Sequence, residues 1–431
     1  MKFFKYISIA LIAFTITGCE IQDEPNPNGS ILEGFSDDPS DSELQALVTG
    51  TENLLRQEIG FYYDVVSIVG REYYFFTGSD PRYTGEVLGK GESVLDNAGF
   101  YGTRPYYGRF KTIKNLNVLK DAVAASTQIT AQETEGYLGF AKTIQAYEYH
   151  LALNLQGSNG IRFDVADPAN LGPFLEYDAA LDAIADLLND AATHLENAGD
   201  SFPFVLSTAM AGFDSPAGFL TFNKALAARI ALYQGNKADA LNNLTASFIN
   251  MAGDLNVGPA RFYSTAGGDF TNNIFRPLGQ ADAIIAHPSY TNDIENGDAR
   301  INKVAMREDT LALDGLSGNY DVNVYKSLNY FVPYIRNEEL ILIAAEANIG
   351  ADNAAAIAAI DVIRTAAGLA TYSGGNSDAE LVTELIKQRR YSLFGEGHRW
   401  VDMRRWGMLG DLPLDRAGDN VWDKFPRPVS E

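Results

Sequence analysis

The sequence predicts an all-α, mainly helical protein in which helix pairs form a tetratricopeptide-like scaffold that carries long irregular loops. Three observations predict this class. Apolar residues recur at the spacing of amphipathic helices over much of the chain. Two segments are typical of alanine-lined helix pairs joined by a tight, glycine-containing turn. Long stretches rich in glycine, asparagine, aspartate and tyrosine separate the helical segments.

The first two helices are expected at Ala131–Leu155 and Tyr177–Leu195. In the first segment, Leu138, Ala141 and Ile144 fall on one face of a helix, and the second segment repeats this spacing. Each segment therefore predicts a helix that buries one side.

Two helix hairpins are expected at Phe222–Leu244 and Asn337–Leu369. In each hairpin the first helix is rich in alanine and stops at a glycine, Gly235 or Gly350. Gly368 is expected to cap the end of the second hairpin. Small residues let paired helices approach closely, so both hairpins favour a repeat-like scaffold.

A further helix is expected to begin after Ser377, which forms an S-x-x-E capping signal with Glu380. Leu381, Leu385 and Ile386 continue from it at helical spacing.

Four stretches are expected to be irregular: 70–109, 156–176, 200–219 and 256–333. Loops this long inside a compact domain are usually functional or disordered. Their aromatic residues argue against disorder. The stretches are therefore the places to look for a ligand.

The N-terminus predicts a lipoprotein signal peptide at residues 1–18, because a basic start precedes a short apolar run and Ile-Thr-Gly-Cys. The run is shorter than the roughly 20 residues of a membrane span. Cys19, the only cysteine, is the expected lipid attachment site and excludes an intrachain disulfide. Residues 19–38 begin with an acidic, proline-containing sequence that predicts a flexible tether.

The formal net charge of −23 argues against nucleic-acid partners, which select basic surfaces. No zinc-protease motif, nucleophile elbow or phosphate-binding loop is present, and the four histidines are scattered. We therefore predict no enzyme activity, no cofactor and no metal site. A carboxylate pair for glycoside cleavage stays open, because the acidic residues are too numerous to exclude one.

The segment Leu385–Gly407 concentrates arginines together with two of the three tryptophans. It resembles the C-terminal signature of the SusD/RagB family of nutrient-binding outer-membrane lipoproteins, although Gln388, Ser392 and Gly395 depart from that pattern. The ending FPRPVSE is similar to the family's usual ending. The signature residues are expected to form a structural lock and include Glu396, His398, Arg399, Trp400, Asp402, Arg404, Arg405 and Trp406.

Glu339 and Glu346 also fit a glutamate pattern of the family's helical core. We expect them to form buried ion pairs with the C-terminal arginines.

The resemblance implies a non-catalytic, lipid-anchored protein on the outside of the outer membrane. It would capture oligosaccharides and deliver them to a SusC-like TonB-dependent transporter. Three alternatives stay open: a lipid-anchored helical glycoside hydrolase, a peptide-binding member of the same family, and a repeat-protein scaffold without a small ligand. The resemblance also suggests an N-terminal part at 39–260 and a C-terminal part at 261–431, which together form one compact unit.

Ligand contacts are predicted from composition alone. Carbohydrate recognition combines flat apolar ring faces with groups that hydrogen-bond to hydroxyls, and tyrosine supplies both. Two aromatic-rich segments, Phe61–Phe110 and 260–333, contain such residues. The selected candidates are Tyr73, Tyr74, Asp80, Arg82, Tyr83, Tyr101, Tyr106, Tyr290, Tyr320 and Tyr325.

Overall fold

The computed structural model describes residues 37–431. The predicted signal peptide, Cys19 and all but the end of the predicted tether lie outside the described residues. Among residues 37–431, no helix is both long enough and apolar enough to cross a bilayer.

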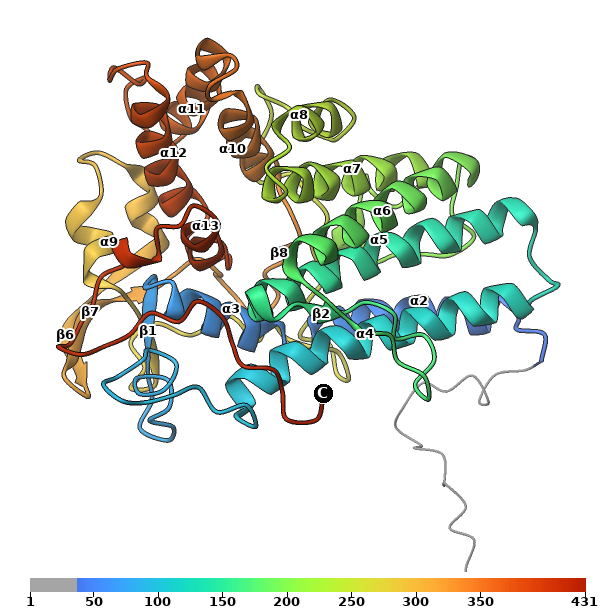
Figure 1. Cartoon of the computed structure of the whole chain (residues 1–431), viewed down its shortest axis with the longest axis horizontal. Coiled ribbons are helices and arrows are strands. Elements are labelled where there is room, and N and C mark those ends of the chain that lie inside the picture. The colour runs from blue at the N-terminus through green and yellow to red at the C-terminus, as the bar shows by residue number, and fades with distance from the viewer. Residues whose placement is uncertain (1–36) are drawn as a thin grey trace, which may run out of the picture.

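The protein is mainly helical, as the sequence predicts, and its long helices lie side by side (Figure 1). Apolar faces at helical spacing pack several of the helices on the next helix along the chain. The first group of helices comprises α2 (Asp41–Arg56), α3 (Ile59–Val69), α4 (Phe100–Ala125), α5 (Ala131–Gln156), α6 (Tyr177–Asn197) and α7 (Pro216–Tyr233).

The predicted helix hairpins are confirmed and continue the stack. Glycines with positive φ turn the chain at the ends of these helices, at Gly235, Gly350 and Gly368. Ser377 accepts a hydrogen bond from the backbone of Glu380, which confirms the predicted capping box. The helices are α8 (Lys237–Thr245), α9 (Pro288–Asp293), α10 (Asn337–Asn348), α11 (Asn353–Ala366), α12 (Asp378–Ser392) and α13 (Arg399–Arg405).

The expectation of irregular loops at 70–109 and 256–333 is wrong in part. These stretches supply an antiparallel four-stranded sheet, and α4 begins inside the first of them. Two of the strands are short and apolar, and they pair within the core although about 210 residues separate them in the sequence. The sheet has the order β1 (Tyr73–Phe76), β5 (Ala283–Ala286), β7 (Leu316–Val322) and β6 (Val304–Leu313).

Two small strand pairs join further loops. β2 (Ile161–Arg162) pairs with β3 (Phe174–Leu175), and β4 (Ala260–Arg261) pairs with β8 (Val332–Pro333). The β4–β8 pair brings the end of the 256–333 stretch back onto the helical scaffold. The boundary suggested at 260/261 falls within β4 and stays a prediction.

Residues 422–431, which we term the C-terminal strap, run back across the N-terminal helices (Figure 1). The backbone N–H of Phe425 donates to the carbonyl of Leu155 at 2.9 Å, and the Phe425 ring is fully buried. Further along, the N–H of Val429 donates to the carbonyl of Asn97 at 3.1 Å. The strap therefore ties α5 and the segment just before α4 to the C-terminal part of the chain.

Candidate functional site

A cavity of about 680 Å³, which we term the central groove, opens between the loop 323–331 and the start of α10. The short 3-10 helix Thr208–Met210 and the β4–β8 pair close its other sides. Its size is within the range of small-molecule binding sites. Its lining includes Asn256, Lys303, Asn323, Tyr325, Lys326, Ser327, Asn329, Tyr330, Phe331, Arg336, Glu338 and Glu396.

One wall of the central groove is aromatic. Tyr330 and Phe331 are each 39% exposed, which is unusual for side chains of this size. Tyr330 packs against Tyr325 with ring centroids 6.2 Å apart, and Phe331 packs against Phe262 at 5.4 Å. The exposed faces of Tyr330 and Phe331 thus rest on other rings.

The buried residue Asn272 holds the backbone of this wall in place through hydrogen bonds. The backbone N–H of Asn272 donates to the carbonyl of Leu328 at 2.7 Å, and its side-chain amide donates to the carbonyl of Tyr330 at 3.1 Å. Asn272 is 1% exposed, so these bonds are shielded from water. The loop is therefore held in shape before any ligand arrives.

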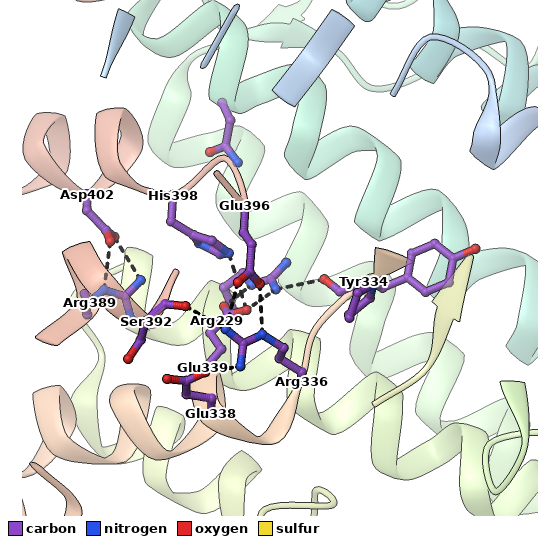
Figure 2. A network of polar contacts seen from close by, with 12 residues as sticks. Arg229, Tyr334, Arg336, Glu338, Glu339, Arg389, Ser392, Glu396, His398 and Asp402 are labelled. Atoms are coloured by element: carbon purple, nitrogen blue, oxygen red, sulfur yellow. Dashed lines mark hydrogen bonds and ion pairs between the residues drawn. The ribbon is translucent and has the colours of Figure 1, made fainter. Parts of the chain in front are cut away.

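The floor of the central groove is charged, and Figure 2 shows the residues that form it. Arg336 donates two hydrogen bonds to Glu396, one from Nε at 2.9 Å and one from Nη2 at 2.7 Å. It also forms an ion pair with Glu338. Burial alone would raise the pKa of Glu338, but Arg336 and Lys303 outweigh burial and hold that pKa below its usual value. Glu338 is therefore ionised, and both carboxylates are bound to the arginine.

Two glycines place Glu396 at this floor. Gly395 and Gly397 both have positive φ, at 72° and 79°, a conformation that glycine adopts without steric cost. A side chain at Gly397 would also approach the ring of Tyr63 to 3.1 Å. The turn between α12 and α13 therefore needs glycine at both positions to direct Glu396 toward Arg336.

Beneath the groove, Glu339 forms a second buried pair (Figure 2). Arg229 donates to it through Nε at 2.6 Å and through Nη2 at 2.7 Å, and His398 Nε2 lies 3.6 Å away. Burial raises the pKa of Glu339, but Arg229 and then His398 overcome this effect and bring the pKa to about 2. The expectation that Glu339 pairs with a C-terminal arginine is wrong, because Arg229 on α7 lies directly opposite.

Glu346, by contrast, does pair with a C-terminal arginine. Arg405 donates to it through Nη2 at 2.7 Å, and Trp406 Nε1 donates to it at 3.0 Å. Asp402 accepts bonds from Arg389 at 2.7 Å and from Arg405 at 2.9 Å. These residues join α10, α12 and α13 and form what we term the C-terminal lock.

The remaining signature residues also hold elements together. Trp400 is fully buried, and its Nε1 donates to the carbonyl of Trp422 in the C-terminal strap at 2.7 Å. Arg404 stacks over the Trp400 ring at 4.5 Å and donates to the carbonyl of Asn154 at 2.8 Å. Arg399 begins α13 and lines a small pocket with residues of α12.

Most of the tyrosines selected as ligand contacts lie in the core. Several of their hydroxyls bond to protein groups: Tyr74 donates to Asp415 at 2.8 Å, and Tyr290 donates to the carbonyl of Arg300 at 2.8 Å. The packing leaves little or no ring surface open to a ligand. The buried tyrosines are Tyr73, Tyr74, Tyr83, Tyr101, Tyr106, Tyr290 and Tyr325.

The other three candidates are less buried. Asp80 and Arg82 form an ion pair at 2.8 Å, and Arg82 lies over the ring of Phe100 at 4.5 Å. Tyr320 is half-buried on β7. Among the ten candidates, only Tyr325 lines the central groove. The predicted ligand role of the ten stays a prediction.

Sequence reasoning placed Tyr330 and Phe331 in an aromatic-rich segment but did not select them. The signal that could have found them is local: they follow Ser327-Leu328-Asn329, where amide and hydroxyl groups alternate with apolar ones. Such mixing is typical of an exposed binding loop rather than a core strand.

Comparison with known proteins fits this architecture. The model of the SusD family matches residues 291–428, which include the C-terminal lock and the loop of the central groove. This part of the chain is similar to the SusD family. The match confirms the resemblance that the arginine–tryptophan segment indicated.

Solved SusD superfamily structures share the fold of nearly the whole chain. A protein from Bacteroides vulgatus aligns with a TM-score of 0.68 at 15% identity, over 91% of this chain and 96% of that one. One from Parabacteroides distasonis aligns with a TM-score of 0.67 at 15% identity, over 89% and 96%. Surface glycan-binding protein A from Bacteroides thetaiotaomicron, in complex with laminarihexaose, aligns with a TM-score of 0.66 at 13% identity, over 90% and 97%.

No curated protein matches the sequence significantly. Within residues 37–431, no group of three or more histidine, cysteine, aspartate or glutamate side chains is arranged to hold a metal ion.

Proposed function

We propose that this SusD-like protein binds oligosaccharides in the central groove. The observation that carries the proposal is the pairing of two exposed ring faces, Tyr330 and Phe331, with the amides of Asn256, Asn323 and Asn329 in one cavity. Ring faces cover the C–H side of a sugar, and amides donate to and accept from its hydroxyls. The surface glycan-binding protein seen with laminarihexaose supports the same class of ligand at the level of the fold.

The ligand is longer than a single sugar. A neighbouring cavity of about 440 Å³ contains Gln45, Asn53 and Arg56. Phe262 lines that cavity and touches Phe331 of the central groove, so the two rings form a ridge between the cavities. A chain of several sugar units would cross this ridge and place rings in both cavities.

The proposal is for binding without catalysis. An inverting or retaining glycosidase needs one carboxyl group that stays protonated to donate a proton. The groove carboxylates Glu338 and Glu396 are instead both held by Arg336. This arrangement favours a binding site over the alternative of a glycoside hydrolase. Nothing in the groove specifically favours a peptide.

The cellular setting is part of the proposal. Cys19 would carry the lipid that anchors the protein to the outer membrane facing the exterior, and residues 19–38 would tether the folded part. Anchoring beside a SusC-like TonB-dependent transporter would raise the effective concentration of captured oligosaccharide at the pore. The parts at 39–260 and 261–431 would act as one unit, since the β4–β8 pair crosses between them.

Calorimetry with a panel of neutral and acidic oligosaccharides tests the proposal. At least one glycan should bind the purified protein, and Tyr330→Ala with Phe331→Ala should weaken binding about tenfold or more, since each ring contributes roughly 1 kcal/mol by stacking. Leu414→Ala, which changes an exposed apolar side chain outside the groove, is the matched control. An absence of glycan binding, or a double variant that binds like the wild type, would contradict the proposal.

Mixing with a detergent-solubilised SusC-like transporter tests the partner. The lipid-free protein and the transporter should co-elute on gel filtration. Separate elution at micromolar concentrations would count against a stable pair.

A further inference from the structure

A second, much smaller pocket lies between α12 and α13, and none of its residues lines the central groove. On each helix the lining residues are spaced three or four apart and so lie on one face, and the two faces meet across the pocket. Its lining comprises Ile386, Arg389 and Arg390 from α12, and Arg399, Asp402, Met403 and Trp406 from α13 and its end. We term it the α12–α13 pocket.

Two guanidinium nitrogens at this pocket have no partner. Arg389 is 3% exposed, and its Nε and Nη2 donate hydrogen bonds to Asp402. Its Nη1 is buried and has no hydrogen-bond partner. Nε of Arg399 is also buried and unbonded. Within residues 37–431 no carboxylate forms an ion pair with Arg399. A buried donor left in this state is costly.

The charges around the pocket do not balance. Asp402 is shared by Arg389 and Arg405, Glu346 is held by Arg405, and Asp293 is held by Arg390. Four arginines therefore share three carboxylates within ion-pair distance, and Arg399 is left without a direct ion pair, with Glu72 and Asp402 acting on it from farther away. Burial and the neighbouring Arg390 lower the pKa of Arg399 to about 10, although Glu72, Tyr391 and Asp402 oppose the shift.

We propose that the α12–α13 pocket binds one monatomic anion, of the halide class, between Nη1 of Arg389 and Nε of Arg399. The free volume of about 10 Å³ is close to the minimum for one water molecule, so a halide enters only if the lining side chains shift slightly, and a whole phosphate or sulfate is excluded. Charged N–H donors form strong hydrogen bonds with an anion. The ion supplies the missing negative charge and stabilises the packing of α13 on α12.

Crystals soaked in sodium bromide give a direct test, because bromide scatters anomalously. We expect an anomalous peak within hydrogen-bonding distance of both nitrogens in the wild-type protein. A water molecule at this position, or an empty pocket, in a crystal that shows bromide elsewhere would overturn the proposal. The measurement needs no variant and is independent of glycan binding.

Thermal unfolding distinguishes a built site from an adventitious ion only. At constant ionic strength, chloride should raise the Tm of the wild-type protein by a few degrees relative to gluconate, which is too large to enter. Arg399→Gln should abolish this difference, and Arg104→Gln, an exposed arginine elsewhere, should retain it. A bromide peak without chloride-dependent stability would mean an adventitious ion only and would overturn the proposal.

Glu72 is the competing counter-charge. Its Oε2 is buried without a partner, and it lies outside the pocket lining. If Glu72 rather than an ion balances Arg399 in solution, Glu72→Gln should lower the Tm and the chloride effect should be absent. That pair of results would also overturn the proposal.

Discussion

Charged side chains inside this protein work as connectors between helices. Glu346 on α10 meets Arg405 on α13, and Asp402 links Arg405 to Arg389 on α12. All four are buried or nearly so, where an ion pair is costly to break because the remaining charge stays without water.

Glu346→Gln tests this connection. The substitution keeps the shape and an acceptor for Trp406 but leaves Arg405 short of one charge, so we expect a loss of about 3 kcal/mol in the free energy of unfolding by urea. The control is Asp190→Asn, which removes a charge from an exposed ion pair with Lys142 and should change the free energy of unfolding by about 0.5 kcal/mol or less. Equal effects of the two substitutions would contradict a structural role for Glu346.

Glu72 gives the protein a pH-dependent stability at the residue scale. Burial raises the pKa of this carboxyl from 4.5 to about 7, although a hydrogen bond from the Gly395 N–H opposes the shift. Between these values the folded state holds a proton that the unfolded state has lost. Stability should therefore fall as the pH rises from about 4.5 to about 7 and then level off.

Glu72→Gln should flatten this pH profile. Above pH 7, the free energy of unfolding of the variant should exceed that of the wild type by up to about 3 kcal/mol, which is the free energy that corresponds to the full pKa shift of Glu72. Urea titrations at several pH values measure the effect. An unchanged slope between pH 4.5 and 7 would show that Glu72 is not the group responsible.

The tyrosines show what sequence could not reveal at this scale. Tyr73 and Tyr74 were selected because tyrosine suits sugar binding, but the same residue suits a core that can satisfy its hydroxyl. Only the fold shows that Asp415, far along the chain, accepts from Tyr74. Composition could not separate these two uses.

Among the elements, local signals predicted helices such as α5, α6 and α10, but they missed α2, α3 and α4 and failed for the sheet. The starts of α5, α6 and α10 match the sequence expectation, because apolar period and caps are encoded within each segment. β1 and β5 are four residues each and pair across the chain, so neither carries a readable period alone. The loop of the central groove depends on that sheet and on Asn272, and it escaped selection for the same reason.

The C-terminal lock and the central groove are expected to be separable elements. Trp406→Ala removes a ring and the bond to Glu346, so we expect a loss of about 2 kcal/mol or more in stability. Glycan affinity per folded molecule should not change, because Trp406 lines no part of the groove. Urea unfolding and calorimetry on the same sample measure both quantities, and a proportional loss of affinity would contradict the separation.

The C-terminal strap is a third element whose contribution can be measured. Phe425→Ala should cost about 3–5 kcal/mol of unfolding free energy, because the ring is fully buried against Trp400 and Tyr101. Val429→Ala in the same strap is 69% exposed in the wild type and should cost about 0.5 kcal/mol or less. Similar values for the two variants would show that the strap is not anchored through Phe425.

The molecule as a whole is strongly acidic, but the central groove contains both basic and acidic side chains. The chain carries a formal charge of −23, yet the floor and rim of the central groove combine Lys303, Lys326 and Arg336 with Glu338 and Glu396. The family resemblance and the helical scaffold could both be inferred from the sequence, because the motif and the apolar spacing that indicate them each lie within a contiguous segment. The groove could not, because its walls come from segments more than one hundred residues apart.

The C-terminal strap also bears on how the protein is made. A ribosome completes α4 and α5 long before it reaches Phe425, whose ring fills the space beside Tyr101 and Trp400. A chain interrupted near residue 420 would contain nearly every helix and still expose that apolar gap. Such a product would be a ready substrate for proteases and chaperones. The strap thus makes the stability of the fold depend on synthesis of the chain through Phe425.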